Sequence, residues 1–410
     1  MDEKLLREVA EEFLRPLISG SHLDAAAAVS KKGHALVAFK SPCQIDFKAA
    51  KADLYRLTLR RSQPFEQDGA AQVTEKKVIE AFVEVVGTMA DGLETPYKTD
   101  ILAAFPRRVV AKALSDDLAR QDSILAALDQ LSLWAGQQYE GKPITAAVGF
   151  DPQLNGGSVP LAQFAKEAFS SVLSNGFDTL LTCSFSGEVA GLETLGPPAQ
   201  APLFSPYRLG AVSEWAQNGR IALVLNRIGE ILVFQDSELR FARRSGRWHF
   251  LTHPPVITQM GGPDNKDLRK AVYATCLDAS FARTGACIGI VTSGHVRDWP
   301  KLAVSADDHM VSNSPKARAL TAMVAGRKFQ DLDRRLRQEL VAIDGATLVD
   351  RTGVLLAVGA ILKIPGGSTG GGRLAAAKAL GTLGVGIKVS QDGGIRGYHA
   401  DGKEPKFTVM

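Results

Sequence analysis

Short apolar segments alternate with amphipathic segments over the first 190 residues of this chain. Residues 35–39, 144–150 and 178–185 have the length and composition of strands. Residues 5–17 and 76–89 instead repeat apolar side chains at the spacing of an α-helix. Because strands and helices that alternate along a chain pack as sheets covered by helices, this pattern predicts an α/β fold.

The length of 410 residues predicts more than one domain, because a single hydrophobic core rarely grows past about 250–300 residues. Turn-forming residues at 196–202 and 261–265 mark the expected boundaries. Residues 1–195 are therefore expected to form an N-terminal α/β domain, and residues 203–262 a connecting region with a short helix and a small antiparallel β-meander. Residues 267–410 are expected to form a mixed sheet flanked by helices.

The composition is that of a globular protein, with 45% hydrophobic and 22% charged residues. The net charge of +4 suits anionic ligands, but no basic run is interleaved with aromatic residues, so nucleic acid is not indicated. The four cysteines include no CxxC pair and fit a reducing cytoplasm. The first residues predict a charged helix and no signal peptide. The sequence contains no apolar run of about 18 residues, so no membrane span is expected.

The strongest local feature is a glycine-rich segment, in which five of the seven residues 366–372 are glycine. An alanine-rich stretch with helical character follows it directly. A glycine loop exposes backbone N–H groups, and the N-terminus of a helix adds unpaired N–H groups and a partial positive charge. The segment therefore predicts a phosphate site, with a flexible surface loop as the alternative; the candidate residues are Ser368, Thr369, Gly370, Gly371, Gly372 and Arg373.

Two known phosphate motifs fit this segment poorly. A Walker A loop requires lysine and a hydroxyl residue after its last glycine, whereas Arg373 and Leu374 follow Gly372 here. Residues 370–375 satisfy the dinucleotide pattern G-x-G-x-x-A, and Asp392 lies at the expected distance of about 20 residues. A dinucleotide turn, however, follows its strand tightly, and too few strands remain after residue 375 to complete such a sheet.

A second feature is the sequence Asp344-Gly345-Ala346, which an apolar residue precedes and an expected strand follows at once. Such an aspartate lies on a loop at the end of a strand, beside open backbone. Its carboxylate suits Mg²⁺ or Mn²⁺, which favour oxygen ligands. Taken alone, the three residues also fit an ordinary Asp-Gly turn.

Two further charged groups have both a functional and an ordinary interpretation. Residues 307–309, Asp-Asp-His, have the residue types of a metal site but also fit a charged loop. Arg334, Arg335 and Arg337 lie on an expected helix that ends near Asp344. They form a solvated helix face, or one of them supplies a cation to a phosphate.

The order of these features along residues 267–410 resembles the diadenylate cyclase domain of the DNA-integrity-scanning proteins and their membrane-bound relatives. In that family a Gly-Ala strand precedes an Asp-Gly-Ala motif, a Gly-Thr-Arg-His-Arg-Ala-Ala segment and a Ser-Glu-Glu-x-Gly segment. Here the order is Gly285-Ala286, Asp-Gly-Ala at 344–346, the glycine loop with its helix, and Ser-Gln-Asp-Gly-Gly at 390–394. The resemblance also implies that residues 1–262 are attached domains with a sensory role.

The resemblance assigns roles residue by residue. Asp344 and its two neighbours match the family's metal- and nucleotide-binding motif, and Arg373 matches the first arginine, whereas Leu374 and Ala375 replace the histidine and second arginine. The implied catalytic residues are Asp344 and Arg373, and the implied ligands of Mg or Mn are Asp344 and Asp392. The implied nucleotide-binding residues are Gly345, Ala346, Ser368, Thr369, Gly370, Gly371, Gly372 and Ser390.

The family's activity implies a nucleotidyltransferase that condenses two ATP molecules into cyclic di-AMP, a signalling nucleotide, in the cytoplasm. Two subunits of a homo-oligomer would meet face to face, each holding one ATP or another NTP. A divalent ion at Asp344 would neutralise the α-phosphate, while the glycine loop and Arg373 would hold the leaving pyrophosphate. Two alternatives stay open, namely a nucleotide sensor without catalysis and a dinucleotide-dependent oxidoreductase.

Overall fold

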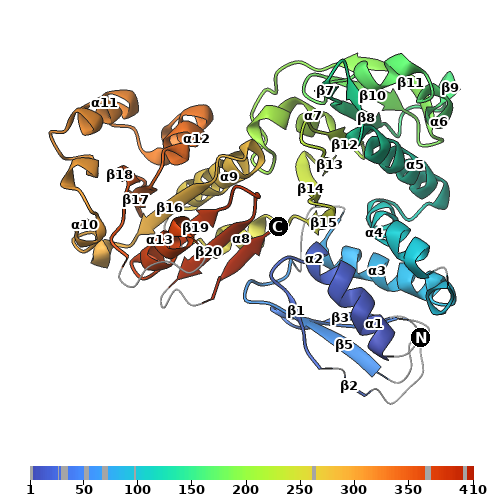
Figure 1. Ribbon diagram of the computed structural model, residues 1–410, viewed down its shortest axis with the longest axis horizontal. Helices are drawn as coiled ribbons and strands as arrows, with labels where there is room; N and C mark the ends of the chain where they lie inside the picture. Colours follow the sequence, from blue (N-terminus) through green and yellow to red (C-terminus); the bar gives the residue numbers. More distant parts are fainter. Residues whose placement is uncertain are drawn as a thin grey trace. The chain divides into compact units, whose positions relative to one another are not determined.

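The computed structural model describes residues 3–25, 27–28, 36–49, 55–66, 73–96, 98–260, 265–364, 371–399 and 404–410. The chain divides into two compact units, an N-terminal unit, Met1–Thr252, and a C-terminal unit, His253–Met410. Both units combine mixed sheets with helices, which confirms the predicted α/β class (Figure 1). Among the described helices, none is both long and apolar enough to cross a lipid bilayer.

The N-terminal unit begins with a helical segment and a small antiparallel sheet, whose described order is β1-β5-β4-β3 with β2 beside β5. Three longer helices and a two-strand hairpin follow. These elements are α1 (Glu3–Val9), η1 (Ala10–Leu14), α2 (Arg15–Leu17), β1 (His22–Leu23), β2 (Ala27–Ala28), β3 (Leu36–Ser41), β4 (Gln44–Lys48), β5 (Tyr55–Arg60), α3 (Glu75–Met89), η2 (Gly92–Glu94), α4 (Lys98–Leu114), α5 (Leu118–Ala135), β6 (Gln138–Tyr139) and β7 (Lys142–Pro143).

A second, larger sheet of this unit has the described order β15-β14-β13-β12-β8-β10-β11-β9. Helix α5 packs on β12 and β13, and Trp215 of α7 lies over Gly149 of β8. The elements are β8 (Ala146–Phe150), β9 (Val159–Pro160), α6 (Leu161–Phe164), η3 (Ala168–Val172), β10 (Thr179–Cys183), β11 (Glu188–Thr194), η4 (Tyr207–Leu209), α7 (Gly210–Trp215), β12 (Ile221–Leu225), β13 (Ile231–Gln235), β14 (Glu238–Arg244) and β15 (Arg247–Phe250).

This sheet corrects the predicted boundary between residues 195 and 203. The sequence predicted a separate connecting region with its own meander at 203–262, whereas β12 pairs antiparallel with β8 along its whole length. All five residues of β12 are buried. A strand buried on both faces needs packing partners on each side, which a small isolated meander does not supply. The meander is therefore half of the larger sheet.

A group of buried charges lies within the N-terminal unit. Arg240 is 1% exposed and donates to the carboxylate of Glu238 at 2.6 Å. Burial raises the pKa of Glu238 to about 7, although the nearby Arg240 opposes this rise. The unit thus holds a carboxyl group that changes its charge near neutral pH.

The C-terminal unit starts at His253, earlier than the predicted residue 267. His253 is buried and its ring lies 2.6 Å from the hydroxyl of Tyr273, so the segment before residue 267 packs within this unit. Its sheet has the described order β18-β17-β16-β19-β20-β21. The elements are α8 (Pro254–Thr258), α9 (Lys266–Ala282), β16 (Ala286–Val291), η5 (Ser293–His295), α10 (Trp299–Leu302), η6 (Ala306–Asp308), α11 (Pro315–Val324), η7 (Phe329–Asp331), α12 (Arg334–Ala342), β17 (Ala346–Asp350), β18 (Leu355–Ala360), α13 (Gly372–Gly381), β19 (Gly384–Val389), β20 (Ile395–His399) and β21 (Phe407–Val409).

Helices cover both faces of this sheet, as predicted (Figure 1). Strand β16 runs parallel to β17 and antiparallel to β19, so the sheet is mixed. Helix α13 packs on β16, β19 and β20, while α12 packs on β16, β17 and β18. Thr347 donates its hydroxyl to the Leu340 carbonyl of α12, whereas its neighbours Ala346 and Leu348 join the core that contains α13. Successive side chains of β17 therefore serve opposite faces.

Gly386 of β19 allows α13 to lie directly on the sheet. A Cβ atom at this position would overlap the carbonyl oxygen of Ala377 and lie 2.8 Å from the amide nitrogen of Gly381. Both atoms belong to the backbone of α13, so neither moves aside without moving the helix. The close approach of α13 to the sheet therefore depends on a glycine at residue 386.

We expect Gly386→Ala to destabilise the C-terminal unit by about 2–3 kcal/mol, the usual cost of overfilling a packed core. For a unit of this size, that loss corresponds to a fall in the unfolding temperature of roughly 5–10 °C. Differential scanning calorimetry of the full chain measures the shift. Gly294→Ala is the matched control, because a Cβ atom at Gly294 meets no atom within 4 Å. Equal transition temperatures for both variants would contradict the proposed contact.

Candidate functional site

The strand registers bring the predicted motif segments to one end of the C-terminal sheet, which we call the site end. Ala346 pairs with Ala360, and Ala286 pairs with Val389. Because β16 and β17 are parallel, both begin at the site end, while β18 and β19 finish there. The segments just before β16 and β17 and just after β18 and β19 therefore meet at this end.

Asp344 lies at the site end, between the last turn of α12 and the start of β17. Its residue is exposed, whereas Ala346 is 1% exposed in the core. Gly345 has a φ of +104°, and a Cβ atom there would lie 2.6 Å from the carbonyl carbon of Gly359 in β18. Glycine at 345 is thus required both by the backbone conformation and by the close approach of β18. The sequence Asp-Gly-Ala fixes a solvent-facing carboxylate on a tightly held turn.

Arg373 lies in the first turn of α13, half-buried, against the turn that precedes β16. A Cβ atom at Gly285 would lie 3.0 Å from Cζ of Arg373, so the guanidinium occupies the space that this glycine leaves. Burial raises the pKa of the Cys287 thiol to about 12, and the nearby charge of Arg373 opposes that rise. Arg373 thus contacts the turn before β16, and Asp344 precedes β17, the strand next to β16 at about 4.8 Å.

Of the glycine segment, Gly371 and Gly372 are described, at the start of α13. Gly371 has a φ of +92° and caps α13, whose first residue is Gly372. The backbone N–H groups of the first turn of α13 thus begin at the site end. The predicted ligands Ser368, Thr369 and Gly370 lie outside the described residues.

Ser390 and Asp392 lie in the turn between β19 and β20. The Ser390 amide donates to the Gly394 carbonyl at 2.9 Å, which closes the turn. Strand β16 lies between β17, which follows Asp344, and β19, which precedes this turn. The turn therefore lies roughly 10–15 Å from Asp344 across the sheet. Among the described residues, no group of three or more His, Cys, Asp or Glu side chains forms a metal site. A shared ion at Asp344 and Asp392 remains a prediction.

The donor set at Asp344 suits a magnesium-type ion that a nucleotide brings with it. Mg²⁺ is commonly held by one or two carboxylates together with substrate phosphates, and it keeps several waters. The exposed carboxylate of Asp344 leaves room for such an arrangement. The residues present therefore fit a metal–nucleotide complex better than a metal ion enclosed by protein ligands alone.

The structure corrects the suggestion that Arg334 reaches a phosphate. Arg334 makes a two-pronged ion pair with Asp278 of α9, at 2.7 Å through Nε and 3.0 Å through Nη2. It also lies at the first residue of α12, about 15 Å along the helix from Asp344. Arg337 donates to the carbonyl of Gln330 at 3.2 Å. Both guanidinium groups serve packing within the unit.

Residues 307–309 do not form the metal cluster that their types allow. Asp308 makes an ion pair with Lys316 at 2.6 Å, and the His309 ring packs 4.5 Å from the ring of Trp299.

The dinucleotide alternative also fails on topology, because β18, β19 and β20 are antiparallel to their neighbours rather than parallel. In addition, eleven residues separate β18 from α13.

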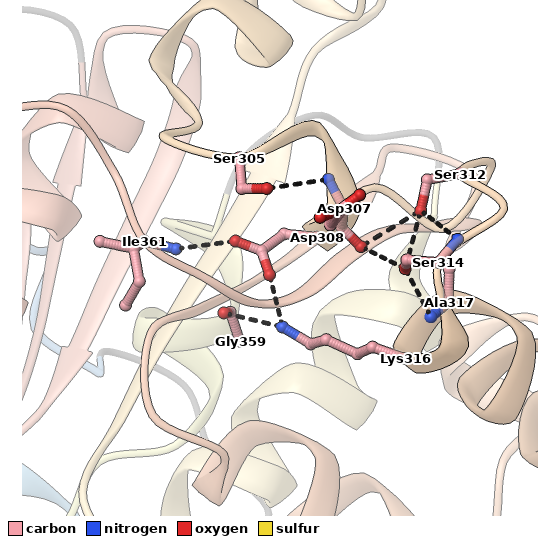
Figure 2. A network of polar contacts seen from close by, with 9 residues as sticks. All are labelled: Ser305, Asp307, Asp308, Ser312, Ser314, Lys316, Ala317, Gly359 and Ile361. Carbon is pink, nitrogen blue, oxygen red and sulfur yellow. Dashed lines mark hydrogen bonds and ion pairs between the residues drawn. The ribbon is translucent and has the colours of Figure 1, made fainter.

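Sequence reasoning missed the ion pair between Lys316 and Asp308, which lies beside Gly359 and Ile361 (Figure 2). The four residues are spread over more than 50 positions, and no spacing rule connects them. One signal was present in the sequence, since Ser314-Pro315 is a typical helix start and places Lys316 in the first turn of α11. Only the fold shows that this turn lies next to β18.

No family model and no curated protein matches this sequence. Among solved structures, a double cysteine mutant of DacA from Staphylococcus aureus aligns with 18% sequence identity. The alignment covers 36% of this chain and 90% of that chain, with a TM-score of 0.25. A score this low does not establish a common fold, so the functional argument depends on the residues and the geometry of the chain itself.

Proposed function

We propose that the C-terminal unit binds a nucleoside triphosphate as its metal complex and condenses two ATP molecules into cyclic di-AMP. The observation that supports this proposal is the meeting of four segments at the site end of the sheet. These are the turn at Asp344, the guanidinium of Arg373, the N-terminus of α13 and the turn at Ser390. A carboxylate, a cation and the N-terminus of a helix together suit a metal-bound polyphosphate.

In the proposed reaction, the 3′-oxygen of one ATP attacks the α-phosphorus of a second ATP held by another copy of the chain. The new P–O bond forms as the bond to pyrophosphate breaks, and the hydroxyl proton passes to water. The reciprocal attack closes the ring, so two ATP give one cyclic di-AMP and two pyrophosphates. A metal ion at Asp344 would withdraw charge from the phosphate that is attacked.

This chain's own residues would act mainly by position and charge. Arg373 would hold the β- and γ-phosphate oxygens of the leaving group, together with the N–H groups at the start of α13. Gly345 would allow the nucleotide to approach the backbone beside Asp344. Two copies must meet face to face, because each active site supplies only one of the two nucleotides.

A second candidate function is nucleotide sensing without catalysis. Leu374 packs against the apolar core under α13, and neither Leu374 nor Ala375 donates a side-chain hydrogen bond. Losing one positioned donor in a transition-state site commonly lowers a rate by about 10²–10³. A site without both donors would still bind a nucleotide through Asp344 and Arg373.

The test is incubation of the full chain with each of the four NTPs and Mn²⁺, followed by mass spectrometry of the products. We expect cyclic di-AMP and pyrophosphate from ATP, at a rate that rises steeply with protein concentration because two copies must meet. Tight ATP binding without product would instead establish the sensor. Binding of neither ATP nor another NTP would reject both functions.

A further inference from the structure

Lys316 presents a positive charge beside Asp308 and Gly359 (Figure 2). Its Nζ donates to Oδ1 of Asp308 at 2.6 Å and to the carbonyl oxygen of Gly359 at 3.1 Å. A lysine ammonium has three protons, so these two bonds leave one proton for another acceptor. The side chain of Lys316 is 36% exposed, whereas that of Asp308 is 14% exposed. The ammonium is therefore anchored from the protein side and remains accessible to a ligand.

Gly359 links Lys316 to the turn at Asp344. A Cβ atom at Gly359 would lie 3.0 Å from the carbonyl oxygen of Asp344 and 3.3 Å from Nζ of Lys316. The two atoms thus lie within about two hydrogen-bond lengths of each other. A phosphate oxygen bound beside the turn at Asp344 would therefore lie within reach of this ammonium.

The anchor of Lys316 is itself held in place. Oδ2 of Asp308 accepts from the Ile361 amide at 3.4 Å, at the end of β18. The hydroxyls of Ser312 and Ser314 both donate to the carbonyl of Asp307, at 3.1 Å and 2.7 Å (Figure 2). Ser314 also caps α11 by accepting from the Ala317 amide. The loop and the first turn of α11 therefore hold Lys316 in one position.

The charges at the site end indicate why a further cation is useful. A nucleoside triphosphate with a divalent ion still carries about two negative charges near neutral pH. Arg373 supplies one positive charge, while Leu374 and Ala375 supply none and Arg334 is paired with Asp278. Lysine binds phosphate as a point charge and needs no fixed fork geometry.

We propose that Lys316, positioned by Asp308, is a phosphate-binding residue of this nucleotide site and contacts the α-phosphate beside the turn at Asp344. This inference rests on the proposed nucleotide binding by the C-terminal unit. It does not require catalysis, because the ammonium contacts the polyphosphate in the bound state. Asp308 acts as a positioning residue that holds the lysine ammonium in place beside Gly359.

The experiment measures binding of α,β-methylene ATP and of AMP, each with Mg²⁺, by calorimetry on the full chain. The α,β-methylene bridge prevents release of pyrophosphate, so binding is separated from reaction. We expect Lys316→Met to weaken binding of the triphosphate and of AMP alike, about tenfold, because both ligands carry the α-phosphate. Lys316→Arg should retain the triphosphate within about threefold, because it keeps the charge. Asp308→Asn should give an intermediate loss.

Lys328→Met is the matched control, because Lys328 is exposed and precedes Phe329, whose amide donates to Gly353 at the opposite end of the sheet. Wild-type affinity for the triphosphate in Lys316→Met would overturn the role of Lys316, and a loss for the triphosphate with wild-type affinity for AMP would overturn the contact to the α-phosphate. Thermal unfolding of each variant identifies a loss of fold. If the wild-type chain binds no nucleotide, the proposed function itself fails, and that outcome is distinct from wild-type binding that Lys316→Met leaves unchanged.

Discussion

Asp344→Asn is expected to lower the rate of cyclic dinucleotide formation by about 10²–10³ or more. Asparagine keeps the shape of the side chain but removes its negative charge, and a divalent ion with oxygen ligands binds a neutral amide more weakly. The metal ion would then no longer be held against the α-phosphate, where its charge is needed in the transition state. The side chain is exposed, so the substitution should leave the fold intact.

The measurement is the initial rate of product formation at saturating ATP, with Mn²⁺ varied over a wide range. If Asp344 holds the ion, the variant should require more Mn²⁺ and recover part of its rate at high Mn²⁺. Asp331→Asn is the control, because Asp331 is also exposed but lies near Gly353 at the other end of the sheet. A wild-type rate and metal requirement in Asp344→Asn would exclude Asp344 as the metal ligand.

Asp392→Asn extends this comparison to the second predicted ligand. Asp392 lies two strands from Asp344, so the two carboxylates share one ion only if that ion is bridged by the nucleotide or by water. A loss equal to that of Asp344→Asn would support a shared ion. An unchanged metal requirement would remove Asp392 from the site.

Asp278→Ala is expected to destabilise the C-terminal unit by about 3–5 kcal/mol, the usual cost of removing one partner of a buried ion pair. Asp278 is 1% exposed and Arg334 is 8% exposed at their side chains, so water does not replace the lost carboxylate. Arg337 lies close enough for its charge to matter, because burial and Arg334 both lower the pKa of Arg337 whereas Asp278 raises it. The variant would leave two guanidinium groups without this balancing charge.

Calorimetric unfolding of the full chain tests this prediction. The double variant Asp278→Leu with Arg334→Leu should recover most of the lost stability, because it removes both buried charges and fills the space with apolar atoms. Asp298→Ala is the contrasting control, since Asp298 makes an exposed ion pair with Lys301, and water and salt screen such a pair. Equal stability losses in Asp278→Ala and Asp298→Ala would contradict the structural role of the buried pair.

The architecture of the C-terminal unit was largely predictable because local signals define its elements. The apolar stretch before Thr292, the turn at Asp350 and the glycines before Arg373 each mark a strand, a hairpin or a helix start. The order of these elements in the structure agrees with the sequence. The pairs β17–β18 and β19–β20 also follow from chain order, because short connections favour antiparallel neighbours, whereas the central position of β16 does not.

The parts that sequence reasoning got wrong depend on contacts between distant residues. Arg334 was a candidate phosphate ligand because its expected helix ends near Asp344, but its partner Asp278 lies on another helix, 56 positions earlier. The meander at residues 221–250 was read as separate because its strands are joined by local turns. Only the structure shows that β12 pairs with β8 and that both faces of β12 are buried. Lys316 was missed for the same reason, since Gly359 lies 43 positions away.

The central position of β16 has a consequence for how the C-terminal unit folds. Strands β17 and β18, like β19 and β20, are joined by short turns and form with little loss of chain entropy. Strand β16 is different, because Ile288 pairs with Thr347 and Ala286 pairs with Val389, far along the chain. Contacts between such distant residues slow folding. We therefore expect the two hairpins to form before β16 pairs with them. The end of the sheet beside Asp344 and Arg373 would then be completed in the slowest step of folding.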